Sequence, residues 1–230
     1  MTSARAQILS AVRRNLHADR GRGDSARRAE VTTRLRHHPR GPVPARSDLE
    51  PAARVDLFQQ QAETASATVA RVAAWDDLPG AVSAYLRARN LSAEVTLAPH
   101  PDLDGINWAV GAPVVGVRRG TPDPDTAVGV SRALAGVAET GTLLLRSGAD
   151  SPTTLNFLPA NHIVALHAAE IVGPYEDAWD RLRAEQADGA VPRTVNLVTG
   201  PSRTADIEQT LQLGAHGPMN LHIVVVGDVG

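Results

Sequence analysis

The chain has 230 residues, of which 43% are hydrophobic, so it can bury one sizeable core, and its length favours one domain with an appendage. It contains no cysteine, which excludes disulfides and leaves no thiolate for zinc or an iron–sulfur cluster. No apolar run approaches the roughly 20 residues of a membrane helix, and the N-terminus lacks a secretory pattern, so we expect a cytoplasmic chain without membrane contact. Only 3% of the residues are aromatic, which makes nucleic acid an improbable partner.

The charge divides the chain into two parts. Residues 1–46 hold 11 arginines against 3 acidic residues, whereas residues 47–230 hold 12 arginines against 22 acidic residues. The spacing of Ile8, Leu9, Val12 and Leu16 predicts an amphipathic helix over residues 4–16.

The segment that follows, from about Ala18 to Ser47, is rich in Arg, Pro, Gly and His and predicts a flexible linker or arm. Residues 1–47 are therefore expected to form a basic helix with a partly disordered arm, and 48–230 an α/β domain. Two interpretations of the arm stay open: a solvated tail without function, or a segment that docks on an acidic partner surface.

The rest of the chain alternates between short β-branched runs and longer helical patterns. This alternation predicts a mostly parallel open sheet with helices on both faces. Strands are expected at 67–73, 93–97, 114–117, 142–145, 162–166, 194–198 and 221–226, and helices at 48–64, 78–88, 126–137, 176–185 and 204–211.

The first candidate site is the segment 199–208, TGPSRTADIE, which follows an expected strand and opens an expected helix. Strand ends and helix N-termini are places where parallel α/β folds bind anions, so a carboxylate or phosphate would fit here. The alternative is that the hydroxyl and acidic side chains only cap the helix. The candidate anion-binding residues are Gly200, Pro201, Ser202, Thr204 and Asp206.

A tight turn, GAHGP at 214–218, presents His216 beside Gly217 before the last expected strand. An imidazole titrates near neutral pH, so His216 is a candidate general acid or base, although a single histidine can equally be structural. The remaining histidines show no metal-ligand spacing, and we expect no metal site.

The third candidate is Glu139, with Thr140 and Gly141, between the expected helix 126–137 and the strand 142–145. The carboxylate could act as a base or orient a substrate if this turn faces the same crevice as the other two segments. The alternative is an ordinary helix C-terminal turn with Gly141 in the left-handed conformation. Nucleotide-binding and hydrolase motifs such as GxGxxG, GxxxxGK[ST] and GxSxG are absent from the sequence.

Several of these segments together resemble one known family. The stretches AETGTLLL (138–145), PANHIVAL with EIV (159–172), TGPSRTADIE (199–208) and GAHGP (214–218) resemble the LUD domain, and the helical N-terminus resembles its LutC-like members. The resemblance covers about residues 60–230. It implies a NagB/RpiA/CoA transferase-like fold and a subunit of a multi-protein system that oxidises L-lactate to pyruvate.

In that system the resemblance places the iron–sulfur clusters on cysteine-rich partner subunits, with no cofactor on this chain. A small carboxylate such as lactate or pyruvate is then the expected ligand of the crevice. Two alternatives remain: a stand-alone enzyme acting on a sugar-phosphate, folate or acyl-CoA substrate, or a scaffold subunit without catalysis.

Overall fold

The computed structural model describes residues 4–18, 24–185, 192–204 and 212–229. The chain divides into two units, residues 1–42 and 43–230. Among the described residues, no helix is both long enough and apolar enough to cross a membrane.

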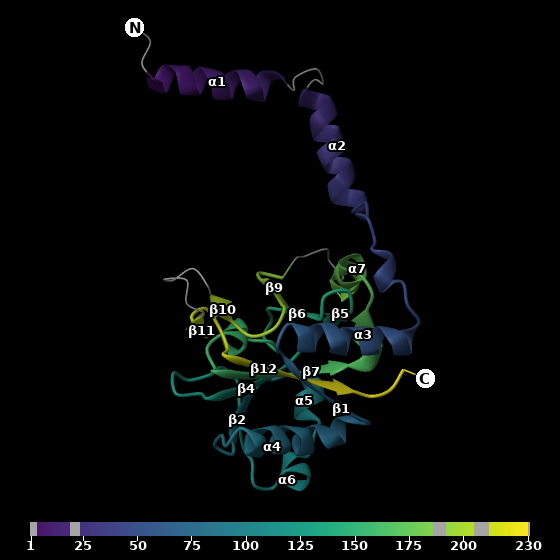
Figure 1. Ribbon diagram of the computed structural model, residues 1–230, viewed down its shortest axis with the longest axis vertical. Coiled ribbons are helices and arrows are strands. Elements are labelled where there is room, and N and C mark those ends of the chain that lie inside the picture. The colour runs from purple at the N-terminus through teal and green to yellow at the C-terminus, as the bar shows by residue number, and fades with distance from the viewer. Residues whose placement is uncertain (1–3, 19–23, 186–191, 205–211, 230) are drawn as a thin grey trace. The chain divides into compact units, whose positions relative to one another are not determined.

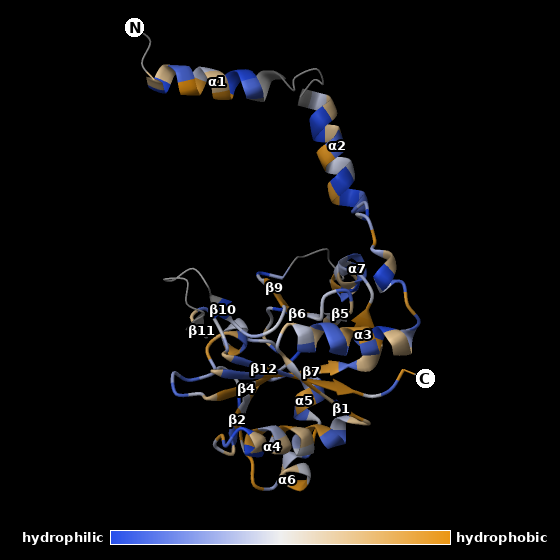
Figure 2. Ribbon diagram, viewed as in Figure 1, coloured by the Kyte–Doolittle hydropathy of each residue, from blue (hydrophilic) through white to orange (hydrophobic). Residues whose placement is uncertain are grey.

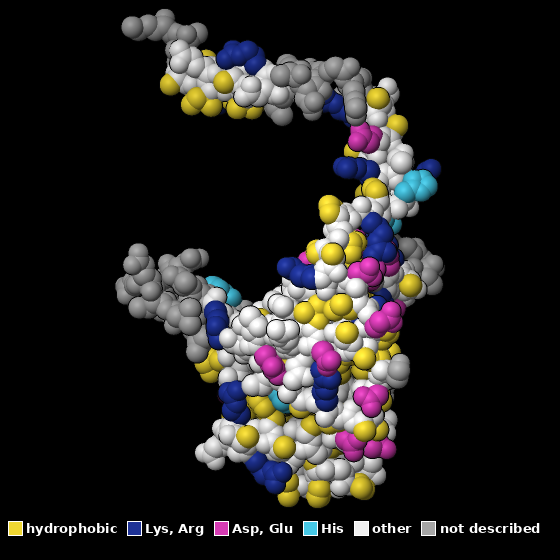
Figure 3. Space-filling model, turned by 45° about the vertical axis from the view of Figure 1, so that its right-hand side comes forward, with side chains coloured by type: hydrophobic (Ala, Val, Ile, Leu, Met, Phe, Trp, Pro, Cys, Tyr) yellow, Lys and Arg dark blue, Asp and Glu magenta, His cyan; other side chains and the backbone are white. Residues whose placement is uncertain are grey.

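The first unit consists of two helices, α1 (Ala4–Ala18) and α2 (Asp24–His37). Helix α1 confirms the amphipathic pattern, because Ile8, Leu9 and Val12 are exposed and gather along one side of the helix (Figures 2 and 3). Helix α2 lies within the segment whose composition predicted a flexible linker. Its sequence, DSARRAEVTTRLRH, contains neither Gly nor Pro, and the residues that break helices lie on either side of it.

A six-stranded parallel sheet forms the centre of the second unit (Figure 1). All of its pairs are parallel, as the alternating pattern predicted. In spatial order its strands are β1 (Thr68–Val72), β12 (Asn220–Val226), β7 (Asn161–His167), β4 (Val128–Arg132), β2 (Glu94–Leu97) and β3 (Gly116–Arg119).

Helices cover both faces of this sheet, which explains why its central strands are nearly continuous apolar runs. Helix α3 (Pro51–Thr64) packs on one face through Val55 and Phe58. Helix α4 (Leu78–Ala88) packs on the other face through Leu78, Val82 and Leu86, so both predicted helices are confirmed. The helices α5 (Pro101–Asp104) and α6 (Trp108–Gly111) and the 3-10 turns η1 (Ala45–Ser47), η2 (Trp75–Asp77), η3 (Thr153–Asn156) and η4 (Ala168–Glu170) join the larger elements.

The helix predicted at 126–137 is wrong. This stretch forms two strands, β4 in the central sheet and β5 (Ala135–Val137) in a second sheet. Most of its residues are small or β-branched, and residues 128–137 are buried, a composition that fits a buried strand as well as a helix. The strand packs so closely at Gly136 that no side chain fits there: a Cβ would lie 2.6 Å from Leu166 and 2.9 Å from Phe58.

The second sheet has four strands and lies beside helix α7 (Tyr175–Glu185). Its central element is an antiparallel hairpin of β5 and β6. In spatial order the strands are β8 (Ile171–Val172), β5, β6 (Thr142–Arg146) and β9 (Val195–Val198).

The helix predicted at 204–211 does not begin at Thr204. Thr204 belongs to β10 (Arg203–Thr204), which pairs antiparallel with β11 (Gln212–Leu213), and residues 205–211 lie outside the described part of the chain. The pairing extends through Ser202, whose backbone N–H donates to Pro218 O and whose carbonyl accepts from Gly214 N. Thr204 itself is therefore extended, and the remainder of the predicted helix falls outside the described residues.

Candidate functional site

The turn that carries Glu139 and Thr140 joins the two strands of the β5–β6 hairpin, so it is not the helix C-terminal turn of the alternative interpretation. Gly141 has φ +66° and lies directly against helix α3, where a Cβ would come 2.2 Å from Ala62 N. Glycine is therefore required here for both backbone conformation and close approach. The effect is to hold the turn firmly on the α3 backbone.

Four hydroxyl groups meet beside this turn, and we call Thr140, Thr142, Tyr175 and Thr199 the hydroxyl cluster. Thr142 Oγ1 lies 2.7 Å from Thr140 Oγ1, 2.8 Å from Tyr175 Oη and 2.6 Å from Thr199 Oγ1. Thr140 Oγ1 and Tyr175 Oη are 2.9 Å apart. The cluster brings together two of the segments singled out in the sequence, 138–145 and 199–208.

Glu139 projects from the same turn and pairs with an arginine that the sequence did not indicate. Its carboxylate Oε1 lies 3.3 Å from Arg46 Nη2, and its backbone N–H donates to Gly173 O. The Glu139 side chain is 13% exposed, whereas that of Arg46 is 62% exposed. A largely exposed guanidinium with a single long contact keeps donors available for another anion.

Helix α7 begins at Tyr175, so the first residue of an eleven-residue helix contributes its hydroxyl to the cluster. The sequence predicted a helix N-terminus beside the anion-binding candidates, but it assigned that helix to residues 204–211, whereas the helix at the cluster is α7. The cluster, Arg46 and Glu139 together form what we call the turn site.

The other predicted candidates lie around Ser202. His216 is exposed, and its backbone N–H donates to Ser202 Oγ at 3.3 Å. Gly217 packs against the same serine, with a Cβ position 3.6 Å from Ser202 Cβ. Gly200 has φ +72° and approaches Ala65 O so closely that a Cβ would be 2.1 Å away. The structure thus brings two predicted segments together through backbone contacts.

The single crevice expected from the sequence is only partly assembled. Thr199 belongs to the hydroxyl cluster, and Pro201, half-buried, leads to Ser202. No hydrogen bond or ion pair among the described residues joins Glu139 to Ser202 or His216. The side chain of Thr204 and the whole of Asp206 lie outside the described residues.

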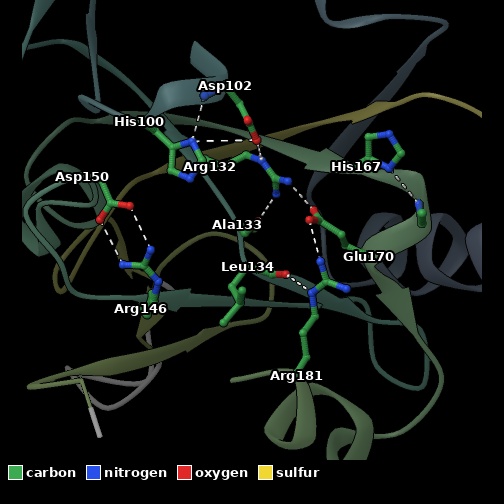
Figure 4. A network of polar contacts seen from close by, with 11 residues as sticks. His100, Asp102, Arg132, Ala133, Leu134, Arg146, Asp150, His167, Glu170 and Arg181 are labelled. Atoms are coloured by element: carbon green, nitrogen blue, oxygen red, sulfur yellow. Dashed lines mark hydrogen bonds and ion pairs between the residues drawn. The ribbon is translucent and has the colours of Figure 1, made fainter. Parts of the chain in front are cut away.

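A second polar site lies at the carboxyl ends of three neighbouring strands of the parallel sheet, β2, β4 and β7 (Figure 4). We call it the charged pocket; its volume is about 160 Å³. His100 follows β2, Arg132 ends β4, and Glu170 follows β7. The pocket is lined by His100, Asp102, Arg132, Ala133, Leu134, Arg146, Ser151, Glu170 and Glu185.

Arg132 is the centre of the charged pocket, and only 8% of its side chain is exposed. Its Nε lies 3.0 Å from Asp102 Oδ2, its Nη2 lies 2.5 Å from Glu170 Oε2, and its Nη1 donates to the carbonyl of Ala133. The guanidinium also lies 5.1 Å from the ring centroid of Trp75. The buried charge of Arg132 is tolerated because it is paired with two carboxylates, although its contact with Glu170 Oε2 is an ion pair without hydrogen-bond geometry.

Two further arginines complete this network. Arg181 donates to Glu170 Oε1 at 2.7 Å and to Leu134 O at 2.9 Å. Arg146 contacts both carboxylate oxygens of Asp150, at 3.0 and 2.9 Å, and this pairing holds the pKa of Asp150 below its ordinary value. Burial lowers the pKa of His100, against the opposing influence of Asp102, so this imidazole is neutral at neutral pH.

Comparison with known proteins identifies part of the chain. Residues 125–226 match the model of the LUD domain. The matched residues include the hydroxyl cluster, Glu139, Ser202, His216 and, in the charged pocket, Arg132, Arg146 and Glu170, whereas Arg46 and His100 precede the matched region.

Curated relatives match the same region. The chain is 36% identical over 102 residues to "Lactate utilization protein C" of Bacillus subtilis (strain 168), covering 44% of this chain and 42% of the relative. It is 37% identical over 98 residues to an uncharacterized protein of Neisseria meningitidis serogroup B, covering 43% of this chain and 41% of that protein. The match therefore spans about two fifths of the length of these relatives.

A solved structure supports the fold over a larger part of the chain. The crystal structure of a DUF162 family protein from Deinococcus radiodurans matches 78% of this chain and 99% of its own, with a TM-score of 0.57 at 22% identity. At this identity the likeness confirms the α/β fold alone.

Sequence reasoning missed the charged pocket because the expected helix at 126–137 removed β4 from the sheet. The prediction therefore placed Arg132 inside a helix and not at the carboxyl end of a strand, where the structure has it. The available signal was polar residues directly after expected strands, namely His100 and Asp102 after 93–97 and Glu170 after 162–166. Arg46 gave no signal, since it lies in a segment whose composition indicated an arm without fixed structure.

Proposed function

We propose that this chain takes part in lactate utilization, and that its LUD domain binds a small carboxylate such as lactate or pyruvate at the turn site. The names of several curated relatives support the process, over the part of the chain that matches them. The observation that carries the location is the 2.6 Å contact between Thr142 and Thr199, because it assembles two family segments beside a cation and a helix N-terminus.

The turn site suits a carboxylate for three physical reasons. Arg46 supplies an exposed guanidinium, which binds carboxylates through paired hydrogen bonds. The N-terminus of α7 favours negative charge. The hydroxyl cluster supplies donors that can turn toward a ligand. Its four contacts use the four hydroxyl protons. A ligand oxygen would therefore accept the proton that now joins Thr140 and Tyr175, whose contact of 2.9 Å is the longest of the four.

Glu139 and His216 remain the proposed acid–base groups, and Glu139 is the better placed. Its carboxylate lies beside Arg46, where the carboxylate of the ligand would bind. From there it could accept the proton of the hydroxyl group on the carbon next to the ligand carboxylate.

Oxidation of L-lactate to pyruvate removes two electrons and two protons. A chain without cysteine lacks the usual ligands for an iron–sulfur cluster, so we place the electron carriers on partner subunits.

The first unit is the proposed contact with such a partner. The apolar residues Ile8, Leu9 and Val12 are exposed on α1, and residues 1–42 hold 10 arginines. A 15-residue helix is marginal in water unless its apolar face packs on something. An acidic partner surface with an apolar groove would satisfy both properties.

Calorimetric titration of the purified chain with L-lactate and pyruvate tests the site. We expect saturable binding that is weakened about tenfold or more by Arg46→Gln and by Tyr175→Phe, since each loses one hydrogen bond to a charged ligand. Arg71→Gln is the matched control, because Arg71 forms an exposed ion pair with Asp56 on the same unit.

The same three variants should be assayed for growth on L-lactate in a strain that depends on this gene. Loss of growth with Arg46→Gln and Tyr175→Phe, but not with Arg71→Gln, is the expected result. Normal growth with both turn-site variants would refute the location, and normal growth after deletion of the gene would refute the process.

A further inference from the structure

The charged pocket is separate from the turn site. The β5–β6 hairpin lies between them: Ala133, Leu134 and Arg146 at its open end line the pocket, while Glu139 and Thr140 form its turn. The pocket occupies the carboxyl ends of three adjacent parallel strands, where open α/β sheets hold their ligands. Its charged side chains come from β4, β6, η4, α7 and the segment after β2. Figure 4 shows those of Asp102, Arg132, Arg146 and Glu170.

The charges of the pocket disfavour an anion. Each guanidinium is already neutralised by at least one carboxylate within 3.1 Å. Four carboxylates face three guanidinium groups, which leaves a net charge of −1 with His100 neutral; they are Asp102, Asp150, Glu170 and Glu185 against Arg132, Arg146 and Arg181. An added carboxylate or phosphate would meet this excess of negative charge and would have to displace an existing partner.

The hydrogen-bonding groups of the pocket are mixed. His100 Nδ1 accepts from the backbone N–H of Asp102, so in the neutral ring the proton lies on Nε2, which is a donor. Each guanidinium has five N–H groups, and the contacts of Arg132 occupy three of them. Asp102 and Glu185, both 39% exposed, each present a carboxylate oxygen beyond the one paired to arginine. Donors and acceptors therefore stand side by side.

We propose that the charged pocket binds a small uncharged polyhydroxy compound, of the size of a short polyol or a simple sugar. A hydroxyl group donates and accepts at once, which matches the alternation of donors and acceptors in this pocket. A volume of about 160 Å³ is in keeping with a small ligand. The proposal goes beyond the carboxylate site and does not depend on it.

Saturation-transfer NMR and calorimetry with glycerol and D-ribose test the proposal, with L-lactate and inorganic phosphate as anionic probes. We expect at least one of the two polyols to bind, and its affinity to fall about tenfold in His100→Gln and in Glu185→Gln. Asp180→Asn is the matched control, because it changes an ion pair with Arg183 on the same helix as Glu185.

Thermal melting of each variant shows whether it folds; Glu185→Gln changes a partly exposed side chain and keeps its size, so it serves as the second variant if His100→Gln is unstable. Three results would overturn the proposal: no binding of either polyol, polyol binding indifferent to Glu185→Gln, or binding of phosphate or L-lactate that depends on His100 and Glu185. L-lactate binding that depends on Arg46 alone would support the turn site and leave this proposal standing.

Discussion

Replacing Thr142 with valine would test whether the hydroxyl cluster stabilises the domain. Thr142 is fully buried, and its Oγ1 contacts three other hydroxyl groups. Each contact contributes about 1 kcal/mol net to the free energy of unfolding. The full sum is not lost in the variant, because Thr140 and Tyr175 keep their mutual contact and the exposed Thr199 can hydrogen-bond to water. We therefore expect Thr142→Val to lower the free energy of unfolding by about 1–3 kcal/mol.

Urea denaturation measures this loss as a lower midpoint at an unchanged slope. Thr64→Val is the control, since Thr64 is exposed and its hydroxyl bonds only to Gln60 O in the same helix. A difference between the two variants of less than about 0.5 kcal/mol would refute the idea that the cluster stabilises the domain.

Other predictions concern buried histidines and glycines. Burial lowers the pKa of His162 to about 3 and of His222 to about 4, whereas both titrate near 6.5 when unfolded. The unfolded chain thus binds more protons than the folded chain below about pH 6.5, and each histidine should remove about 1.4 kcal/mol of stability per pH unit as the pH falls toward 4. His222→Asn should therefore weaken the dependence of the free energy of unfolding on pH, measured from denaturation curves at several pH values. An unchanged dependence would contradict the prediction. Gly141→Ala should cost about 3 kcal/mol or more, because φ is +66° and the Cβ meets Ala62, as the urea midpoint would show. Gly80→Ala, in open space on α4, should instead raise the free energy of unfolding by about 0.5–1 kcal/mol, and a loss of stability there would count against the helix assignment.

Much of the fold could be predicted from the sequence because its strands and helices have distinct periods. Helix 78–88 and the strands that became β1, β2, β7, β9 and β12 are confirmed within two residues. The stretch 126–137 could not be assigned, because its apolar and small residues are compatible with a buried strand as well as with a helix. Only the packing of Gly136 against Phe58 and Leu166 decides for strands.

The candidate site was predictable in part. Turn residues such as Glu139 and Thr140 could be found because glycine and polar residues interrupt apolar runs. Their partners could not, since Tyr175 and Arg46 are 35 or more positions away and contact the turn only through the tertiary fold. A sequence pattern records local spacing and carries no information on which exposed arginine reaches which carboxylate.

The β5–β6 hairpin has a consequence for how the two sites communicate. Its turn belongs to the turn site, its open end lines the charged pocket, and β8 and β9 pair with it on either side. A hydrogen-bonded ladder held on both edges moves as one piece, so a ligand that shifts one end shifts the other. For the two proposed ligands, occupancy of the pocket should then change the affinity of the turn site, and thermodynamic reciprocity requires the turn-site ligand to change the affinity of the pocket by the same factor.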